Sequence, residues 1–412
     1  MDNVIFCRRG KPFYGWFVCL GCMITIFITM GVISNCFSVF LPYIMTENGF
    51  TNTEGTSLTT LRCLVSFVAM FATGSFYHRF SLRWGLVFTL VVGAVSFLLY
   101  AVAESYYLYA IASCFSGLSY GLGSMIPVTI LISRWFDEKR AVAVSICAAG
   151  SGIAAILMPI ITSCLVETFS LAAAFYGETF GIVVLMALVA CLLRNDPSEK
   201  RLEPYNIPEK RIKTKNSAYL SPKEPLKKVV WYHLYLIAFL MGSISVSVSA
   251  CLALLFRTEG FSVSYTAILI SVYGIFLTVF KVVYGEMAER FGGKKTTVAF
   301  LVLLCFGIGG CALSFFENEF LAMISCVLVG LGFPVATVGF SVWATDLTIK
   351  EEFSIVIRRL QIIYAAGALA CSSLPGVLAD VFSSYIPAFL LFFLGMVIIL
   401  LLFLRSYALQ LK

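Results

Sequence analysis

The chain has 412 residues, of which 60% are hydrophobic and 12% are charged. Soluble globular proteins carry about 25% charged residues, so this composition argues against a soluble protein and indicates one that crosses a membrane many times. The net charge of +7 is not a sign of nucleic-acid binding, because the basic residues gather between the apolar runs on one side of the predicted membrane.

Apolar runs recur along the whole chain, each long enough to cross a hydrocarbon core of about 30 Å as a helix. The twelve predicted spans are 14–41, 56–77, 84–103, 106–132, 141–166, 171–193, 231–256, 264–287, 297–315, 320–345, 355–379 and 384–405. The first run is too long for a signal peptide and lacks a small-residue cleavage site, so we expect it to be retained. The sequence therefore predicts an all-α membrane protein.

The Lys and Arg residues of the predicted loops predict the topology. Ten of them lie between Arg194 and Lys228, on the same side as most other loop cations. The opposite loops are acidic, with Arg257 as their one basic residue. Because basic loops stay in the cytoplasm, we expect a multi-pass protein of the cell membrane with both termini cytoplasmic. We also expect it to be surrounded by lipid and to be a monomer.

Residues 194–230 interrupt the apolar pattern with Pro, Lys, Arg and Glu, which predicts a cytoplasmic linker. It separates two six-helix bundles, residues 1–193 and 231–412. The bundles repeat each other: ENGFT at 47–51 recurs as TEGFS at 258–262, and GSFYHRF at 74–80 recurs as GEMAERF at 285–291, both offset by 211 residues. Matches in the same order with a constant offset indicate a duplicated, pseudo-symmetric fold.

Small residues cluster on two spans and predict close helix packing. They are Gly117, Gly121 and Gly123 on the fourth span and Gly150, Gly152 and Ala155 on the fifth. The run GLSYG at 117–121 matches the nucleophile-elbow pattern, but no strand precedes it. No GxxxxGK[ST] motif occurs either, so we expect neither an enzyme nor an ATP-driven pump.

The cysteines and histidines predict no metal site and no cofactor. The 14 cysteines scatter through the spans as small apolar residues do. The close pair Cys19 and Cys22 lies in the first span without further metal ligands. His78 and His233 fall near predicted membrane surfaces, which argues against a buried histidine proton relay.

Lys281 is a lone cation within the eighth predicted span. Steps of three and four residues place it on one helix face with Ser271, Gly274, Thr278 and Gly285. A charged side chain at mid-membrane costs a few kcal/mol even on the lenient insertion scale, so it faces a bundle interior or a wet cavity and marks a functional path. The sequence predicts a substrate-binding role for Lys281.

The loop signatures GSFYHRFSLRWG and GEMAERFGGKK, together with twelve spans and a central linker, resemble the major facilitator superfamily. In that family the corresponding loops read approximately G-x-x-x-D-R-x-G-R-[RK]. The resemblance covers the whole chain and implies the superfamily's two-bundle fold and transport by alternating access. It assigns a gating role to a set of loop residues: Arg79, Arg83, Glu289, Arg290 and Lys294. The first copy departs from the pattern, because His78 stands where the acid is usual.

Two further stretches, YGWFV at 14–18 and RWFDEKRAVAVSICAAGSGIA at 134–154, are similar to the monocarboxylate transporter and oxalate/formate exchanger group. The resemblance implies a substrate-binding cation on the eighth span, at Lys281, and another on the eleventh, where Arg358 fits better than Arg359. Animal carriers of that group have an acid where this chain has Leu277 and a lysine where it has Asn35, which makes Asn35 a further candidate for substrate binding. Their proton-coupling residues are therefore not visible here, which favours anion exchange or uniport.

Three more residues complete the predicted substrate site. Arg62 shares a helix face with small and polar residues and is expected to line the outer vestibule or to contact an anion. Tyr120 and Tyr273 lie near mid-span and are candidate hydroxyl donors to a carboxylate. For each, the alternative is structural: a membrane cation can bond helix carbonyls, and an aromatic residue can pack.

The shortage of intramembrane acids, of which Glu178 is the one candidate, suggests that the negative charge arrives with the substrate. The sequence thus predicts a secondary transporter of small mono- or dicarboxylates. Three alternatives stay open: export of larger organic anions or amphipathic compounds, proton-coupled carboxylate symport, and a transporter-like receptor that binds without turnover.

Overall fold

The computed structural model describes residues 13–50, 52–205, 226–349, 352–371 and 374–410. These residues form helices, and the one β-bridge among them joins Phe136 and Tyr205. Twelve helical segments are long and apolar enough to cross a membrane, which confirms the predicted all-α membrane fold and the number of spans. The chain divides into two units, Met1–Pro208 and Glu209–Lys412.

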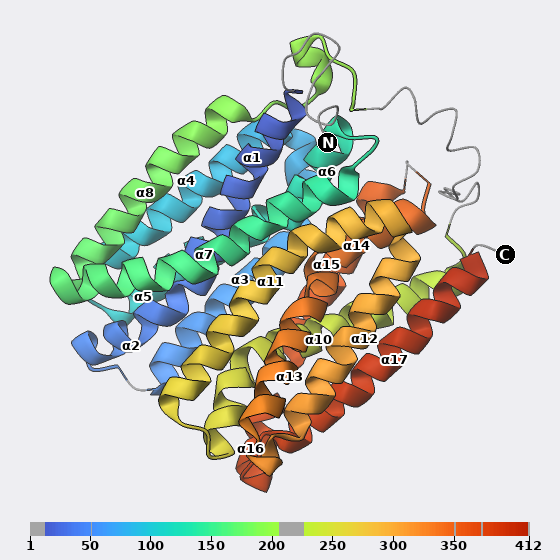
Figure 1. The fold of residues 1–412 in the computed structure, drawn as a ribbon. Helices are drawn as coiled ribbons and strands as arrows, with labels where there is room; N and C mark the ends of the chain where they lie inside the picture. The colour runs from blue at the N-terminus through green and yellow to red at the C-terminus, as the bar shows by residue number, and fades with distance from the viewer. Residues whose placement is uncertain (1–12, 51, 206–225, 350–351, 372–373, 411–412) are drawn as a thin grey trace. The chain divides into compact units, whose positions relative to one another are not determined.

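Unit 1 contains the first six spans, and the course of its helices can be followed in Figure 1. Its elements are α1 (Gly15–Ile26), the π-helix η1 (Phe27–Asn35), α2 (Phe37–Asn48), α3 (Asn52–Arg79), α4 (Leu82–Ala101), α5 (Tyr106–Leu122), α6 (Met125–Trp135), α7 (Arg140–Thr168), α8 (Leu171–Leu192) and the 3-10 turn η2 (Pro197–Lys200). The first span runs through α1, η1 and α2, and the fourth through α5 and α6. Two of the six spans therefore have irregular backbone along their length.

Unit 2 contains the remaining six spans. Its elements are α10 (Lys228–Thr258), α11 (Val263–Phe291), α12 (Gly293–Ala312), the 3-10 turn η3 (Ser314–Phe316), α13 (Glu319–Gly332), α14 (Pro334–Leu347), α15 (Phe353–Cys371), α16 (Leu374–Phe382) and α17 (Ile386–Gln410). The tenth span breaks between α13 and α14, at the position in the repeat where the fourth span of unit 1 also breaks.

The described ends of the predicted linker each fold onto one unit. Tyr205 exchanges backbone hydrogen bonds with Trp135, Asp137 and Glu138, and its ring packs 5.2 Å from that of Phe13. Burial and the charge of Glu138 raise the pKa of Tyr205. At the other described end of the linker, in unit 2, the Lys227 backbone amide donates to Gln410 Oε1 at 3.2 Å. Residues 206–225 lie outside the described residues.

The small-residue seams predicted in unit 1 are present where α5 meets α3. A Cβ atom added to Gly117 would meet the carbonyl oxygen of Arg62, and one added to Gly121 would come 2.5 Å from the carbonyl oxygen of Ser66. Gly150 of α7 is similarly close to the carbonyl oxygen of Met23 on α1. Glycine at these positions lets helix backbones touch, as is typical of membrane bundles.

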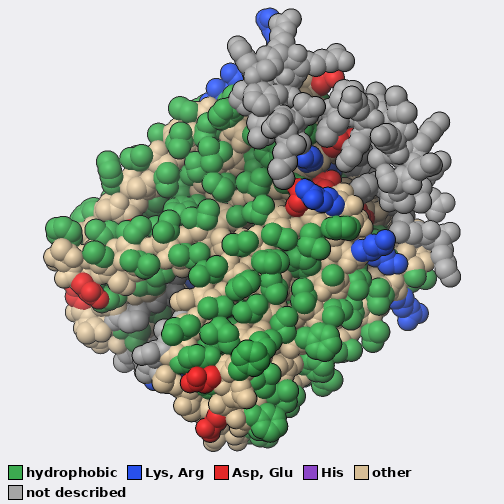
Figure 2. Space-filling model, in the orientation of Figure 1, with side chains coloured by type: hydrophobic (Ala, Val, Ile, Leu, Met, Phe, Trp, Pro, Cys, Tyr) green, Lys and Arg blue, Asp and Glu red, His purple; other side chains and the backbone are tan. Residues whose placement is uncertain are grey.

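The outer surface is apolar along the helices. In Figure 2 the side chains on the visible face are mostly hydrophobic, and the charged ones lie near helix ends. Large side chains that are highly exposed include Val68, Phe180 and Leu401, at 61%, 71% and 62%. Exposed apolar side chains in the middle of long helices are what a lipid-facing surface requires.

Candidate functional site

Arg62 of α3 is buried, at 8% exposed, and its guanidinium is directed at the π-helix of the first span. It donates to the carbonyl oxygens of Ile33 at 3.2 Å and Ser34 at 2.8 Å. Its Cζ also lies 4.9 Å from the centre of the Phe37 ring. A π-helix shifts the backbone hydrogen-bond pattern by one residue, and within a membrane the carbonyls it frees need other donors. This geometry favours a structural role for Arg62.

Two hydroxyl groups support the same irregular backbone. Thr29, within η1, donates to the carbonyl oxygen of Gly123 at 3.0 Å, at the break between α5 and α6. Tyr77 of α3 donates to the carbonyl oxygen of Leu122 at 2.9 Å. Thr29 thus joins the π-helix to the break in the fourth span, and Tyr77 joins that break to α3. The sequence pattern singles out neither residue, because it gives no sign of either irregularity.

The two other candidates in unit 1 lie beside these irregular segments. Tyr120 is half-buried on α5, three residues before Gly123. Asn35 is the last residue of η1, and its side chain lies outside the described part of the chain. Their roles in substrate binding stay predictions.

Replacing Arg62 with glutamine should destabilise unit 1 by about 1–3 kcal/mol, because the buried carbonyls of Ile33 and Ser34 lose their charged donor. The check is thermal unfolding of the purified protein in detergent, with the exposed Arg79→Gln as control. An unchanged unfolding temperature, combined with weakened anion binding, would instead place Arg62 in the substrate site.

Lys281 of α11 is buried in unit 2, at 4% exposed. One turn along the helix, the Tyr284 hydroxyl hydrogen-bonds the Thr297 hydroxyl at 2.7 Å, and Trp343 Nε1 donates to the same Thr297 oxygen at 3.0 Å. This network holds α11 against α12 and α14. On the other side, Gly330 of α13 lies against the α11 backbone at Leu277. Tight packing around Lys281 fixes the position of its backbone.

The polar face predicted for α11 changes in burial along its length. Ser271 is exposed, and a Cβ atom on Gly274 would meet nothing within 4 Å. Lys281 and Gly285 are buried. The polar face is thus exposed near the start of the helix and buried at Lys281.

Two hydroxyl pairs lie at the contacts of α10 with its neighbours. Tyr273 of α11 hydrogen-bonds Ser249 at 3.1 Å, and Tyr364 of α15 hydrogen-bonds Ser245 at 2.7 Å. The Tyr273 ring also packs 5.7 Å from that of Phe333, where the tenth span breaks. Tyr273 was predicted as a candidate donor. Sequence reasoning missed Ser245, Ser249 and Tyr364, because serine spacing on α10 alone does not reveal the tyrosines opposite.

The two arginines near the start of α15 have different surroundings. Arg359 is exposed, donates to the Tyr235 hydroxyl at 3.3 Å, and stacks over the Trp231 ring at 5.1 Å. Arg358 is half-buried on another side of the helix. Because Arg359 is engaged by the aromatic residues of α10, Arg358 is the better candidate for a substrate contact.

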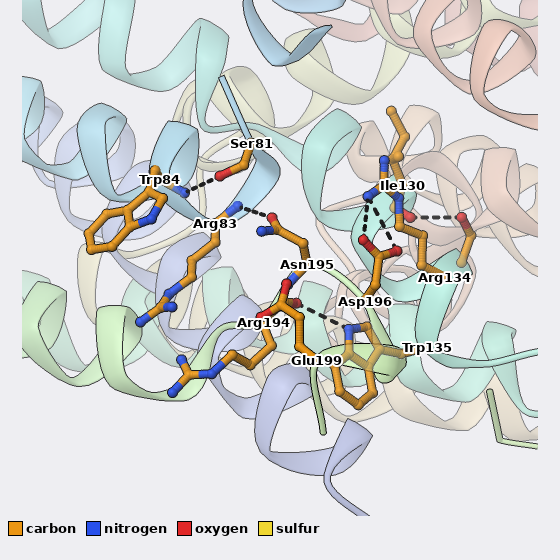
Figure 3. Close-up of polar contacts among 11 residues, drawn as sticks. Ser81, Arg83, Trp84, Ile130, Arg134, Trp135, Arg194, Asn195, Asp196 and Glu199 are labelled. Carbon is orange, nitrogen blue, oxygen red and sulfur yellow. Dashed lines mark hydrogen bonds and ion pairs between the residues drawn. The ribbon is translucent and has the colours of Figure 1, made fainter. Parts of the chain in front are cut away.

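The predicted gating loop of unit 1 joins the start of α4 to the end of α8 (Figure 3). Arg83 donates through Nη2 to the carbonyl oxygen of Ala190 at 2.7 Å, and its backbone amide donates to Asn195 Oδ1 at 2.9 Å. Its guanidinium lies 4.8 Å from the centre of the Trp84 ring. Arg79 is exposed.

A second pair in the same region joins α6 to the segment after α8. Arg134 Nη1 lies 3.3 Å from Asp196 Oδ2, and the Trp135 indole donates to the carbonyl oxygen of Arg194 at 3.1 Å. Together with Arg83, these contacts hold together the ends of α4, α6 and α8.

The predicted gating residues of unit 2 lie at the end of α11 and the start of α12. Arg290 pairs with Glu286, one turn earlier on α11, at 2.6 Å, and Glu289 is half-buried. Lys294 lies 5.9 Å from the centre of the Tyr407 ring, and the Tyr407 hydroxyl donates to Asp346 Oδ2 at 2.9 Å. The gating roles themselves stay predictions.

No group of three or more metal-ligating side chains occurs among the described residues. The Sγ atoms of Cys19 and Cys147 lie 3.5 Å apart, both buried between α1 and α7. They pack as thiols within the helix contact.

Residues 22–348 and 234–410 match the family model described as Major Facilitator Superfamily. MFS-type transporter 1 of Ophiocordyceps sp. (strain BCC 1869) is 25% identical over 157 residues, which cover 36% of this chain and 33% of that protein. YoaB of Bacillus subtilis (strain 168) is 28% identical over 145 residues, 34% of each chain. Each alignment thus spans about a third of the relative's length.

Solved structures share the fold over almost the whole chain. The proton:xylose symporter XylE matches with a TM-score of 0.72 and 12% identity, covering 94% of both chains. The E. coli fucose:proton symporter FucP matches with a TM-score of 0.67 and 13% identity, covering 93% of this chain and 97% of that one. At these identities the likeness concerns the fold.

Proposed function

Since the chain belongs to the major facilitator superfamily, whose members are transporters, we propose that it carries small organic anions by alternating access, with Lys281 as the central anion-binding group. The observation that carries this proposal is the burial of Lys281. The charged side chains buried in the described part of the chain are Arg62 and Glu178 in unit 1 and Lys281 in unit 2. Unit 2 therefore buries a cation, and none of its described carboxylates is buried to the same degree.

A buried ammonium group is costly within a membrane helix and marks a functional path. A small carboxylate would supply the opposite charge and accept hydrogen bonds from the ammonium group. Arg358 is the second cation we assign to the substrate, as a contact made during closure. The hydroxyls of Tyr273 and Tyr364, which now bond serines of α10, are donors that a carboxylate could recruit.

The proposal includes a membrane topology, a substrate class and an oligomeric state. The distribution of the basic segments favours cytoplasmic termini, in a multi-pass protein of the cell membrane. The substrate is a mono- or dicarboxylate, the protein acts as a monomer, and no cofactor takes part.

Exchange is the expected mode. An anion bound at Lys281 would offset the buried charge while the carrier reorients, so we expect the half-cycle with substrate to be faster than the empty one. Labelled lactate and labelled oxalate are the probes, one a monocarboxylate and one a dicarboxylate. In proteoliposomes, the same unlabelled anion inside should raise the initial uptake rate at least about tenfold, the factor that corresponds to about 1.4 kcal/mol.

Equal uptake into loaded and empty vesicles would contradict exchange and favour uniport. Uptake of neither anion, together with uptake of bulkier organic anions, would contradict the substrate class. Thermal stabilisation by an anion with no flux under any gradient would favour a receptor.

A further inference from the structure

Glu178 is a carboxylate buried inside the first six-helix unit. It lies on α8 and is 4% exposed. Oε1 accepts a hydrogen bond from the Thr162 hydroxyl of α7. Oε2 is fully buried and has no hydrogen-bond partner among the described residues. Nothing in the proposed anion site of unit 2 involves this group.

Among the described residues, no ion pair joins Glu178 to a cation. The first span contributes the Cys36 thiol, which lies near both Thr162 and the carboxylate. Three residues earlier on α8, the Phe175 ring stacks on the Tyr100 ring of α4 at 5.3 Å, and the Tyr100 hydroxyl is engaged by Ser113 at 2.8 Å.

The remaining charged groups nearby are directed elsewhere. The guanidinium of Arg62 is directed at the carbonyls of Ile33 and Ser34. On α7 the next carboxylate is Glu167, at the exposed end of the helix, where it accepts from the Tyr43 hydroxyl at 3.4 Å. The described residues of α1 that titrate, Cys19 and Cys22, lie at the opposite end of the first span from Cys36.

A carboxyl group in this position is more stable in the membrane as the neutral carboxylic acid than as the ionised carboxylate. An ionised side chain would need hydrogen bonds at both oxygens and a counter-charge, whereas one donor, Thr162, is present. A proton on Oε2 removes the charge and turns the unpartnered oxygen into part of a neutral acid. The reaction is the reversible step from carboxylate and proton to carboxylic acid.

We propose that Glu178 is a proton-binding site of unit 1 and that the proton is the coupling ion of transport. In the occluded state Glu178 carries the proton, and in the states open to water on either side it exchanges that proton with the solvent. Proton binding stands independently of the substrate, and its coupling to transport rests on the proposed anion transport. Exchange of one anion for another can proceed with Glu178 protonated throughout, but net uptake requires Glu178 to bind and release its proton in each cycle.

Glu178 is also placed to act on the first span. Cys36 directly follows the π-helix, and its backbone amide bonds the carbonyl oxygen of Gly31 at 3.2 Å. An ionised Glu178 would accept hydrogen bonds from the Thr162 hydroxyl and the Cys36 thiol more strongly than the neutral acid does. Loading and release of the proton thus change the hydrogen bonds at the point where the first span changes from π-helix to α-helix.

The first test measures proton binding without substrate. Infrared difference spectra of the full-length protein in lipid vesicles, recorded against pH, should show a band from Glu178 among the carboxylic acid carbonyl bands that disappear as pH rises. The band should be absent in Glu178→Gln and displaced in Glu178→Asp. The matched control, Glu167→Gln, should keep it. A spectrum in which Glu178→Gln removes no pH-dependent band would overturn the proposal.

The second test measures coupling in proteoliposomes with labelled lactate. An inward proton gradient of about one pH unit should support roughly tenfold accumulation if one proton accompanies each anion. Glu178→Gln should reduce accumulation to the level without a gradient, and Glu167→Gln should retain it. Full gradient-driven accumulation by Glu178→Gln would overturn the coupling role. Failure of the substrate class appears differently, as absence of lactate uptake with the infrared band intact.

Discussion

Replacing Lys281 with glutamine should lower the uptake of small carboxylates by roughly 100-fold or more. A hydrogen bond to a charged group is worth about 1.5–3 kcal/mol, and the long-range attraction of the cation for the anion is lost as well. Stability should change much less than transport, because glutamine is close to lysine in length and stays polar. The measurement is initial uptake of labelled lactate and oxalate in proteoliposomes, paired with thermal unfolding of the same preparations.

Two variants serve as controls for this result. Lys281→Arg keeps the charge and should retain part of the activity, with altered affinity because the planar guanidinium binds carboxylates differently. Lys295→Gln removes an exposed lysine from α12 and should transport as the original protein does. Uptake by Lys281→Gln at the original rate would remove Lys281 from the substrate site.

Replacing Gly242 with valine should destabilise unit 2 by about 3 kcal/mol, the upper end of the usual cost of overpacking. The helices α10 and α15 cross with their backbones in contact: a Cβ atom on Gly242 would collide with the carbonyl oxygen of Tyr364, and one on Gly367 with the carbonyl oxygen of Phe239. Since backbone atoms cannot move aside as side chains do, the helices themselves would have to separate. That separation would also break the bond between Tyr364 and Ser245.

Thermal unfolding in detergent measures this effect, with Gly376→Ala as the matched control. A Cβ atom on Gly376 would meet nothing within 4 Å, and alanine there should be neutral or stabilise by about 0.5–1 kcal/mol. Equal unfolding temperatures for Gly242→Val and the original protein would show that α10 and α15 do not depend on this contact.

The backbone plan of the molecule follows from its sequence. Hydrophobic length determines the twelve spans, because a lipid core of fixed thickness requires helices of a minimum length. The predicted first span, 14–41, corresponds to Gly15–Leu41, and the last, 384–405, to Ile386–Gln410. The glycines of the fourth span were predicted as packing seams for a similar reason, since small residues mark close helix contacts.

The candidate site was predicted only in part. The burial of Lys281 could be anticipated, because a charge in an apolar helix must turn inward. Glu178 was recognised as an intramembrane acid, but its single donor at Thr162 depends on how α7 and α8 pack. The bond between Tyr364 and Ser245 joins residues that are far apart in the chain, so neither helix pattern alone predicts it.

What the sequence by itself determined is which segments cross the membrane and which side chains must avoid lipid, because both follow from transfer energies of local stretches. What only the tertiary structure decided is the partner of each polar group. Arg62 shows the difference: its helix face predicts a buried cation, and the π-helix of another span supplies the carbonyls that it bonds. Hydrogen-bond partners are set by the packing of helices distant in sequence, and that packing is a property of the whole bundle.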